Sequence, residues 1–188
     1  QATLAILTEN FTRYTYDART ALYLAHVLSL APLSVTIDQN LLAAALTRAI
    51  TESPKRSQPW FILTNLSISH ANTYPVGSAE RAAGYAAAED ILYKYIELVP
   101  TLSGPHFILA QLHLAVGDTA SAAAEAAKGK EYYTRDLETA RRAAVYYENM
   151  TDLPNAAYFL GEVVLLDPSN TAAKDDLIKI QAYEKSKQ

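Results

Sequence analysis

The four histidines are the side chains of this sequence that could support the widest range of chemistry, from metal binding to proton transfer. His106 and His113 are seven positions apart, so on a helix they share one face, but two helical turns separate them by about 10 Å. One metal ion cannot bind both side chains at that distance. The His-x3-His spacing of a zinc-binding helix does not occur in the sequence. We therefore interpret the histidines as packed, hydrogen-bonded residues and expect no metal site.

The carboxylates and glycines also lack a catalytic arrangement. Glu89-Asp90 and Asp175-Asp176 are adjacent pairs, and neighbouring side chains on a helix point about 100° apart, so neither pair forms an acid–base dyad. The six glycines are dispersed, which excludes a phosphate-binding loop and a Gly-x-Ser-x-Gly nucleophile elbow. The absence of cysteine excludes a thiolate nucleophile and a disulfide framework. We expect neither an enzyme nor a bound cofactor.

The composition narrows the class of partner. Of the 188 residues 50% are apolar and only 19% are charged, and the net charge is −4. Without clusters of lysine and arginine, binding to nucleic acid or to an anionic membrane surface is not expected. No run of apolar residues is long enough for direct membrane insertion. Thirteen tyrosines favour protein partners, because tyrosine is enriched at protein interfaces.

Alanine-rich segments at helical spacing predict an all-α protein, because alanine is the best helix former and β-branched alternation is nearly absent. Prolines and turn residues divide the chain into about ten helices with short connections, an arrangement typical of antiparallel helix pairs. The expected helices span residues 2–15, 17–30, 38–52, 57–70, 78–98, 103–116, 118–132, 134–150, 153–166 and 170–186.

One phrase of the sequence repeats. Ile96-Glu97-Leu98-Val99-Pro100 returns as Val164-Leu165-Leu166-Asp167-Pro168, 68 residues later, and the turn signal Gly117-Asp118 lies between them. Because 68 is twice 34, and because Trp60-Phe61-Ile62-Leu63 matches a Trp-x2-Leu opening, the sequence resembles the tetratricopeptide repeat (TPR) family. This resemblance implies a right-handed α-α superhelix of about ten antiparallel helices.

The resemblance also implies a division of the chain. Residues 57–170 correspond to three TPR-like units, the first with an insertion near 70–84. Residues 1–56 are N-terminal repeat-like helices, and residues 171–188 form a C-terminal capping helix. The segment 41–63 is also similar to the soluble repeat arrays of bacterial O-antigen ligase and polymerase proteins.

The TPR resemblance implies a groove built from the first helix of each unit. Chaperone-type members of the family bind a C-terminal carboxylate through lysine, asparagine and arginine, but Phe61 replaces one lysine here and only Asn65 and Arg142 match. That specific activity is therefore disfavoured. The positions carried over to the groove are Gln58, Phe61, Asn65, Phe107, Gln111, Arg141, Arg142 and Glu148.

The ends of the array differ, because the first helix is apolar whereas the last is polar. The residues expected at an end interface are Leu4, Leu7, Phe11, Tyr14, Tyr16 and Tyr74. A start at Gln1 without methionine suggests a processed, extracytoplasmic product. Two hypotheses follow. The chain is a secreted or cell-surface structural protein that self-assembles, for example into a filament, with copies of itself as partners. Alternatively, it is the ligand- or partner-binding domain of a larger bacterial envelope protein such as an O-antigen ligase or polymerase.

Overall fold

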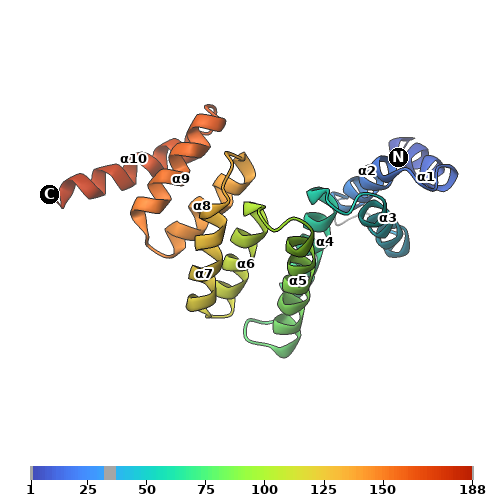
Figure 1. Ribbon diagram of the computed structural model, residues 1–188, viewed down its shortest axis with the longest axis horizontal. Helices are drawn as coiled ribbons and strands as arrows, with labels where there is room; N and C mark the ends of the chain where they lie inside the picture. Colours follow the sequence, from blue (N-terminus) through green and yellow to red (C-terminus); the bar gives the residue numbers. More distant parts are fainter. Residues whose placement is uncertain (1, 32–36, 188) are drawn as a thin grey trace. The chain divides into compact units, whose positions relative to one another are not determined.

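The computed structural model describes residues 2–31 and 37–187, and within these ranges the regular secondary structure is entirely α-helical (Figure 1). The ten predicted helices are confirmed, nine of them to within two residues at each end. Their bounds are α1 Ala2–Arg13, α2 Ala18–Ser29, α3 Gln39–Glu52, α4 Ser57–Ala71, α5 Ala79–Leu98, α6 Ser103–Ala115, α7 Thr119–Glu131, α8 Leu137–Asn149, α9 Leu153–Leu166 and α10 Thr171–Ser186.

Side-chain oxygens fix where most of the helices begin, since they accept the otherwise unpaired N–H groups of the first turn. Such caps are formed by Asp17, Asp38, Ser78, Asp118, Asp136, Asp152 and Asn170. The sequence prediction was wrong for the start of α8, which begins three residues later than expected. Asp136 accepts the N–H of Thr139 at 2.8 Å, and Arg135 has a left-handed φ of +48°, so residues 134–136 cannot belong to the helix.

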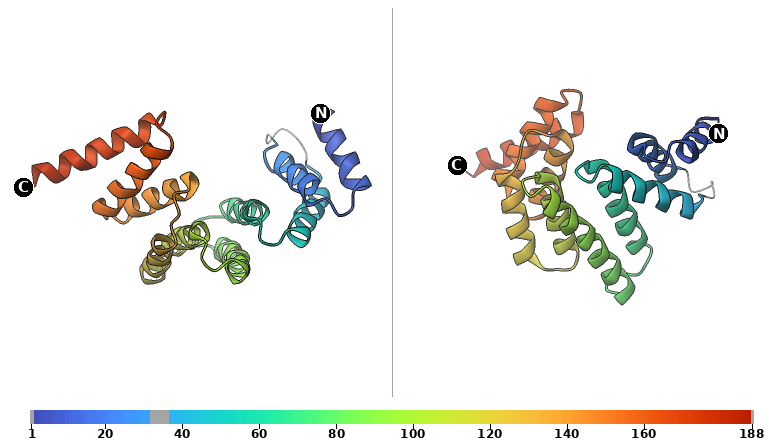
Figure 2. Two further views of the ribbon diagram at one scale, coloured as in Figure 1. Left: turned by 45° about the horizontal axis from the view of Figure 1, so that its top comes forward. Right: turned by 45° about the vertical axis from the view of Figure 1, so that its right-hand side comes forward.

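The chain divides into two compact units, residues 1–100 and 101–188. In the N-terminal unit (1–100), α2 pairs with α3 and α4 pairs with α5, while α1 packs on α2 (Figure 2). Helix α4 also contacts α2 and α3. Leucine and alanine side chains of α2 and α3 form the core of the α1–α3 region, with Phe11 contributed by α1. The apolar side of the first helix therefore folds back onto the following hairpin.

Helices α4 and α5 approach very closely at one point. A Cβ atom added to Gly84 of α5 would lie 2.6 Å from the Cβ of Ala71 and 3.1 Å from its Cα. The Ser67 hydroxyl of α4 donates to the Gly84 carbonyl at 3.1 Å, which holds the two helices together at this point. Only glycine permits this distance.

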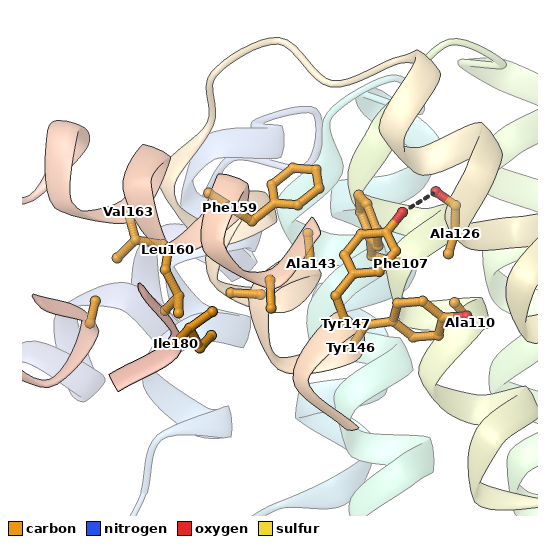
Figure 3. Close-up of a cluster of buried hydrophobic side chains, with 14 of the residues drawn as sticks. Phe107, Ala110, Ala126, Ala143, Tyr146, Tyr147, Phe159, Leu160, Val163 and Ile180 are labelled. Carbon is orange, nitrogen blue, oxygen red and sulfur yellow. Dashed lines mark hydrogen bonds between the residues drawn. The ribbon is translucent and has the colours of Figure 1, made fainter. Parts of the chain in front are cut away.

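In the C-terminal unit (101–188), α6 pairs with α7 and α8 pairs with α9, α6 also contacts α8, and α10 packs on α9. Aromatic rings fill the space between the alanine-lined helices (Figure 3). Phe107, Tyr147 and Phe159 form the centre, with the Tyr147 and Phe159 rings stacked at 5.6 Å. The Tyr147 hydroxyl donates to the carbonyl of Ala126 at 3.5 Å, and burial raises the pKa of Tyr147 to about 12.

The hairpins α4–α5, α6–α7 and α8–α9 lie within residues 57–166, and α2–α3 lies within the first 56 residues. The expected insertion near 70–84 corresponds to a connection between Ala71 and Ala79 and to an α5 of 20 residues. The division into sequence units at residues 56 and 170 stays a prediction. Among the described residues, no helix combines the length and the apolar character that crossing a membrane requires.

Candidate functional site

A cavity of about 290 Å³ opens between α2 and α4 in the N-terminal unit, and we call it the α2–α4 groove. Each helix contributes one face, since the lining positions on α4 follow helical spacing. Leu22 is buried at the floor, where Ile62 packs against the adjacent core. The residues that line the groove are Leu22, Tyr23 and His26 of α2 and Gln58, Phe61, Ile62 and Asn65 of α4.

The Phe61 ring is supported from behind by an aromatic group that joins α4 to α5. Tyr95 of α5 contacts Phe61 edge-on at 6.0 Å and stacks on Trp60 at 5.5 Å. The Trp60 indole donates to the Pro54 carbonyl at 2.8 Å, and the Tyr95 hydroxyl donates to the Lys55 carbonyl at 3.2 Å. Burial raises the pKa of Tyr95, so the hydroxyl stays a donor at neutral pH. Phe61 is therefore held in place before any ligand binds.

The groove combines an apolar floor with an uncharged polar rim. Gln58 and Asn65 each offer an amide that both donates and accepts hydrogen bonds, and His26 adds an imidazole. These three side chains are exposed, and Tyr23 is 56% exposed. No lysine, arginine, aspartate or glutamate lines the groove. The arrangement suits an apolar side chain flanked by peptide groups, and it does not suit a phosphate or a carboxylate.

Three of the predicted groove residues, Gln58, Phe61 and Asn65, come together here. The assignment of Phe107 to a groove is corrected, because its side chain is 0% exposed and lies in the core of the C-terminal unit. The spacing that places Phe107 on a helix could not show which face is covered by the next hairpin.

The remaining predicted groove residues take part in contacts within the C-terminal unit. The Gln111 amide donates to the Arg142 carbonyl at 3.1 Å. Arg141 forms ion pairs with Glu138 and Asp167, each at 2.8 Å. Burial, followed by repulsion from Asp176, raises the pKa of Glu148. A ligand-binding role for these four residues stays a prediction.

The α2 side of the groove, formed by Leu22, Tyr23 and His26, was missed in the sequence. Residues 1–56 lack the 34-residue spacing, so no groove positions were carried over to them. The i, i+3 spacing of Tyr23 and His26 on an otherwise apolar helix was the available signal.

Three of the six expected interface residues are corrected. Phe11 is buried, and Leu4 and Leu7 pack against the same core. The Arg48 guanidinium of α3 lies 3.7 Å from the centre of the Phe11 ring and donates to the Phe11 carbonyl. This Arg48–Phe11 clamp covers the apolar side of α1, which the composition of α1 alone could not show.

The three expected interface tyrosines have different surroundings. Tyr14 and Tyr16, in the turn between α1 and α2, are 50% and 83% exposed. Tyr74 is half-buried, and its hydroxyl lies 3.4 Å from Nε2 of His70.

The side chains with potential for acid–base chemistry serve packing. The His106 ring is buried, with Nδ1 2.6 Å from a carboxylate oxygen of Glu125, which also accepts from Lys128 at 2.8 Å. Burial works against the charge of Glu125, but the hydrogen bonds from His106 and Lys128 outweigh it and hold its pKa below the usual value. Among the described residues, no three histidine or acidic side chains gather as metal ligands.

No family model and no curated protein matches the sequence. Solved structures do match the fold. A thermophilic TPR protein of Thermus thermophilus, TTC0263, is similar over 96% of this chain and 90% of its own, with 13% identity and a TM-score of 0.68. MamA is similar over 94% of this chain and 89% of its own, with 12% identity and a TM-score of 0.55. The predicted all-α, TPR-like solenoid fold is confirmed, while the resemblance to O-antigen ligase and polymerase proteins stays a prediction.

Proposed function

We propose that this chain is a non-catalytic scaffold for protein contacts and that the α2–α4 groove receives an extended segment of a partner protein. The observation that carries the proposal is the groove itself, whose apolar floor lies beneath an uncharged rim of amide and imidazole groups. The TPR-like fold supports it, because helical repeats present extended binding surfaces.

The proposed partner segment places an apolar side chain against Phe61 and Ile62. Its peptide groups pair with the amides of Gln58 and Asn65, which can donate and accept. Because Tyr95 already fixes Phe61, little side-chain entropy is lost on binding. The uncharged lining predicts binding that changes little with salt concentration.

Selection of displayed random peptides on the immobilised full chain tests the proposal. Selected peptides are then titrated by fluorescence anisotropy against the wild type and the variants Phe61→Ala and Asn65→Ala. We expect Phe61→Ala to weaken binding about tenfold or more, since an aromatic anchor carries much of the energy of such a site. Asn65→Ala is expected to have a smaller effect, because its amide is exposed.

Tyr183→Ala is the matched control, because Tyr183 is an exposed tyrosine of α10 outside the groove. Peptides that bind all variants with equal affinity would refute the groove as the binding site. A failure to select any peptide would count against the scaffold function itself.

A second candidate function is self-assembly of a structural protein, and large apolar side chains left exposed on both units favour it. Examples are Ile6, Tyr16 and Leu30 in the N-terminal unit and Leu165, Ile178 and Tyr183 in the C-terminal unit. Filament formation and an extracytoplasmic location stay predictions, as does the alternative of a binding domain within a larger envelope protein. Negative-stain microscopy and cell fractionation would test them.

A further inference from the structure

We propose that the turn between α1 and α2 of one copy, led by Tyr16, docks into a cavity between α7 and the α8–α9 connection of a second copy. The proposal rests on the self-assembly candidate and names the two surfaces that would carry it. We call these surfaces the tyrosine turn (residues 13–17) and the alanine cavity.

The tyrosine turn presents its aromatic side chains in a fixed backbone. Asp17 caps α2 by accepting the N–H of Arg19 at 2.9 Å, and its own N–H donates to the Tyr14 carbonyl at 3.3 Å. The guanidinium of Arg13 lies 5.7 Å from the centre of the Tyr14 ring. Tyr16, at 83% exposed, projects from this turn with its phenol in solvent. A rigid turn with an exposed tyrosine loses little entropy when it binds.

The alanine cavity has a volume of about 480 Å³ and lies entirely within the C-terminal unit. Small side chains of α7 make the space, because Ala123 and Ala127 are exposed and Ala126 is buried beneath them. Figure 3 shows Tyr146 and Tyr147 of α8 close to Ala126. The lining residues are Ala123, Ala126, Ala127, Lys130, Tyr146, Tyr147, Met150, Asp152 and Asn155. A phenol entering this cavity would meet apolar and aromatic surface.

Charge complementarity favours a second copy as the occupant. The tyrosine turn carries Arg13 and Asp17, and the rim of the cavity carries Lys130 and Asp152. Within the part of the chain that the structure describes, none of these four side chains belongs to an ion pair. Docking would bring Arg13 to Asp152 and Asp17 to Lys130, so that one surface offers each charge that the other needs.

The two surfaces differ, so the contact is heterologous, and each copy keeps one free surface of each kind. Such a contact builds a ring or an open chain rather than a closed two-fold dimer. One turn in one cavity is smaller than a standard interface of about 1,200–2,000 Å². We therefore expect assembly that depends on concentration and weakens as salt screens the two ion pairs.

Sedimentation velocity of the full chain over a range of concentrations is the first test. The wild type is expected to associate, whereas Tyr16→Ala and Ala127→Phe are expected to weaken association about tenfold, the first by removing the anchor and the second by filling the cavity. The matched controls are Tyr183→Ala, an equally simple truncation elsewhere, and Ala124→Phe, which places the same ring at an exposed α7 position outside the cavity. Circular dichroism verifies that each variant is folded.

Mixing the two disabled variants gives the sharper test. Tyr16→Ala keeps an intact cavity and Ala127→Phe keeps an intact tyrosine turn, so an equimolar mixture is expected to form heterodimers and to stop there. A wild type that stays monomeric at every concentration would overturn both self-assembly and this docking. Association that persists unchanged in Tyr16→Ala and Ala127→Phe would overturn the docking surfaces and leave self-assembly standing.

Discussion

Replacing Gly84 by alanine tests the close packing of α4 on α5, because the result depends on two opposing effects. Alanine is favoured over glycine within a helix by about 1 kcal/mol. At Gly84, however, the new methyl group would lie 2.6 Å from the Cβ and 3.1 Å from the Cα of Ala71. Neither atom belongs to a flexible side chain, so the helices must separate, and overpacking of this kind costs about 1–3 kcal/mol. We expect a net loss of about 1–2 kcal/mol in the free energy of unfolding.

Gly161→Ala supplies the matched comparison. Gly161 lies within α9, and a Cβ added there meets nothing within 4 Å, so only the helix preference acts. We expect this substitution to raise the free energy of unfolding by about 0.5–1 kcal/mol. The same chemical change is therefore expected to have opposite signs at the two sites.

Thermal and urea unfolding followed by circular dichroism measure both variants. For a chain of this length, the loss at Gly84 corresponds to a decrease of about 2–8 °C in Tm. The double variant Ala71→Gly with Gly84→Ala removes the shortest contact and is expected to recover part of the loss. A Gly84→Ala protein as stable as the Gly161→Ala protein would refute the close approach of the helices.

Two further substitutions test buried polar groups through the pH dependence of stability. The pKa of Glu125 is lowered in the folded state, so its stabilisation is present above its usual pKa and is lost as the pH falls through the lowered value. Glu125→Gln is expected to cost about 1–3 kcal/mol at pH 7 and progressively less in acid, as measured by urea unfolding across pH. Burial raises the pKa of Tyr147 to about 12, so the neutral phenol is favoured by folding, and stability falls between about pH 10 and pH 12 as the unfolded chain ionises. Tyr147→Phe is expected to reduce that alkaline loss, and an unchanged alkaline profile would contradict the burial of the hydroxyl.

The helices could be predicted because their signals are local. Ser78 marks the start of α5 through its own hydroxyl, and the alanine spacing of α7 needs no tertiary information. The start of α8 was misplaced because the left-handed backbone of Arg135 has no signature in the residue type.

The site was predictable only where the repeat spacing was regular. Gln58, Phe61 and Asn65 fall on one face of α4, and the spacing identifies that face. Phe107 follows the same rule, yet it is buried, because the choice between groove and core depends on the neighbouring helices. The burial of Leu4 and Leu7 depends in the same way on α2 and α3, which fold against α1.

The Arg48–Phe11 clamp has a consequence for the motions of the first helix. An isolated helix of 12 residues is only marginally stable in water, so α1 owes its order to its contacts with α2 and to the clamp across 37 positions of sequence. Amide hydrogens of α1 should therefore exchange with solvent through local opening, without unfolding of the hairpin beneath. Because Tyr14 and Tyr16 directly follow α1, a side chain on α3 sets how long their turn stays ordered.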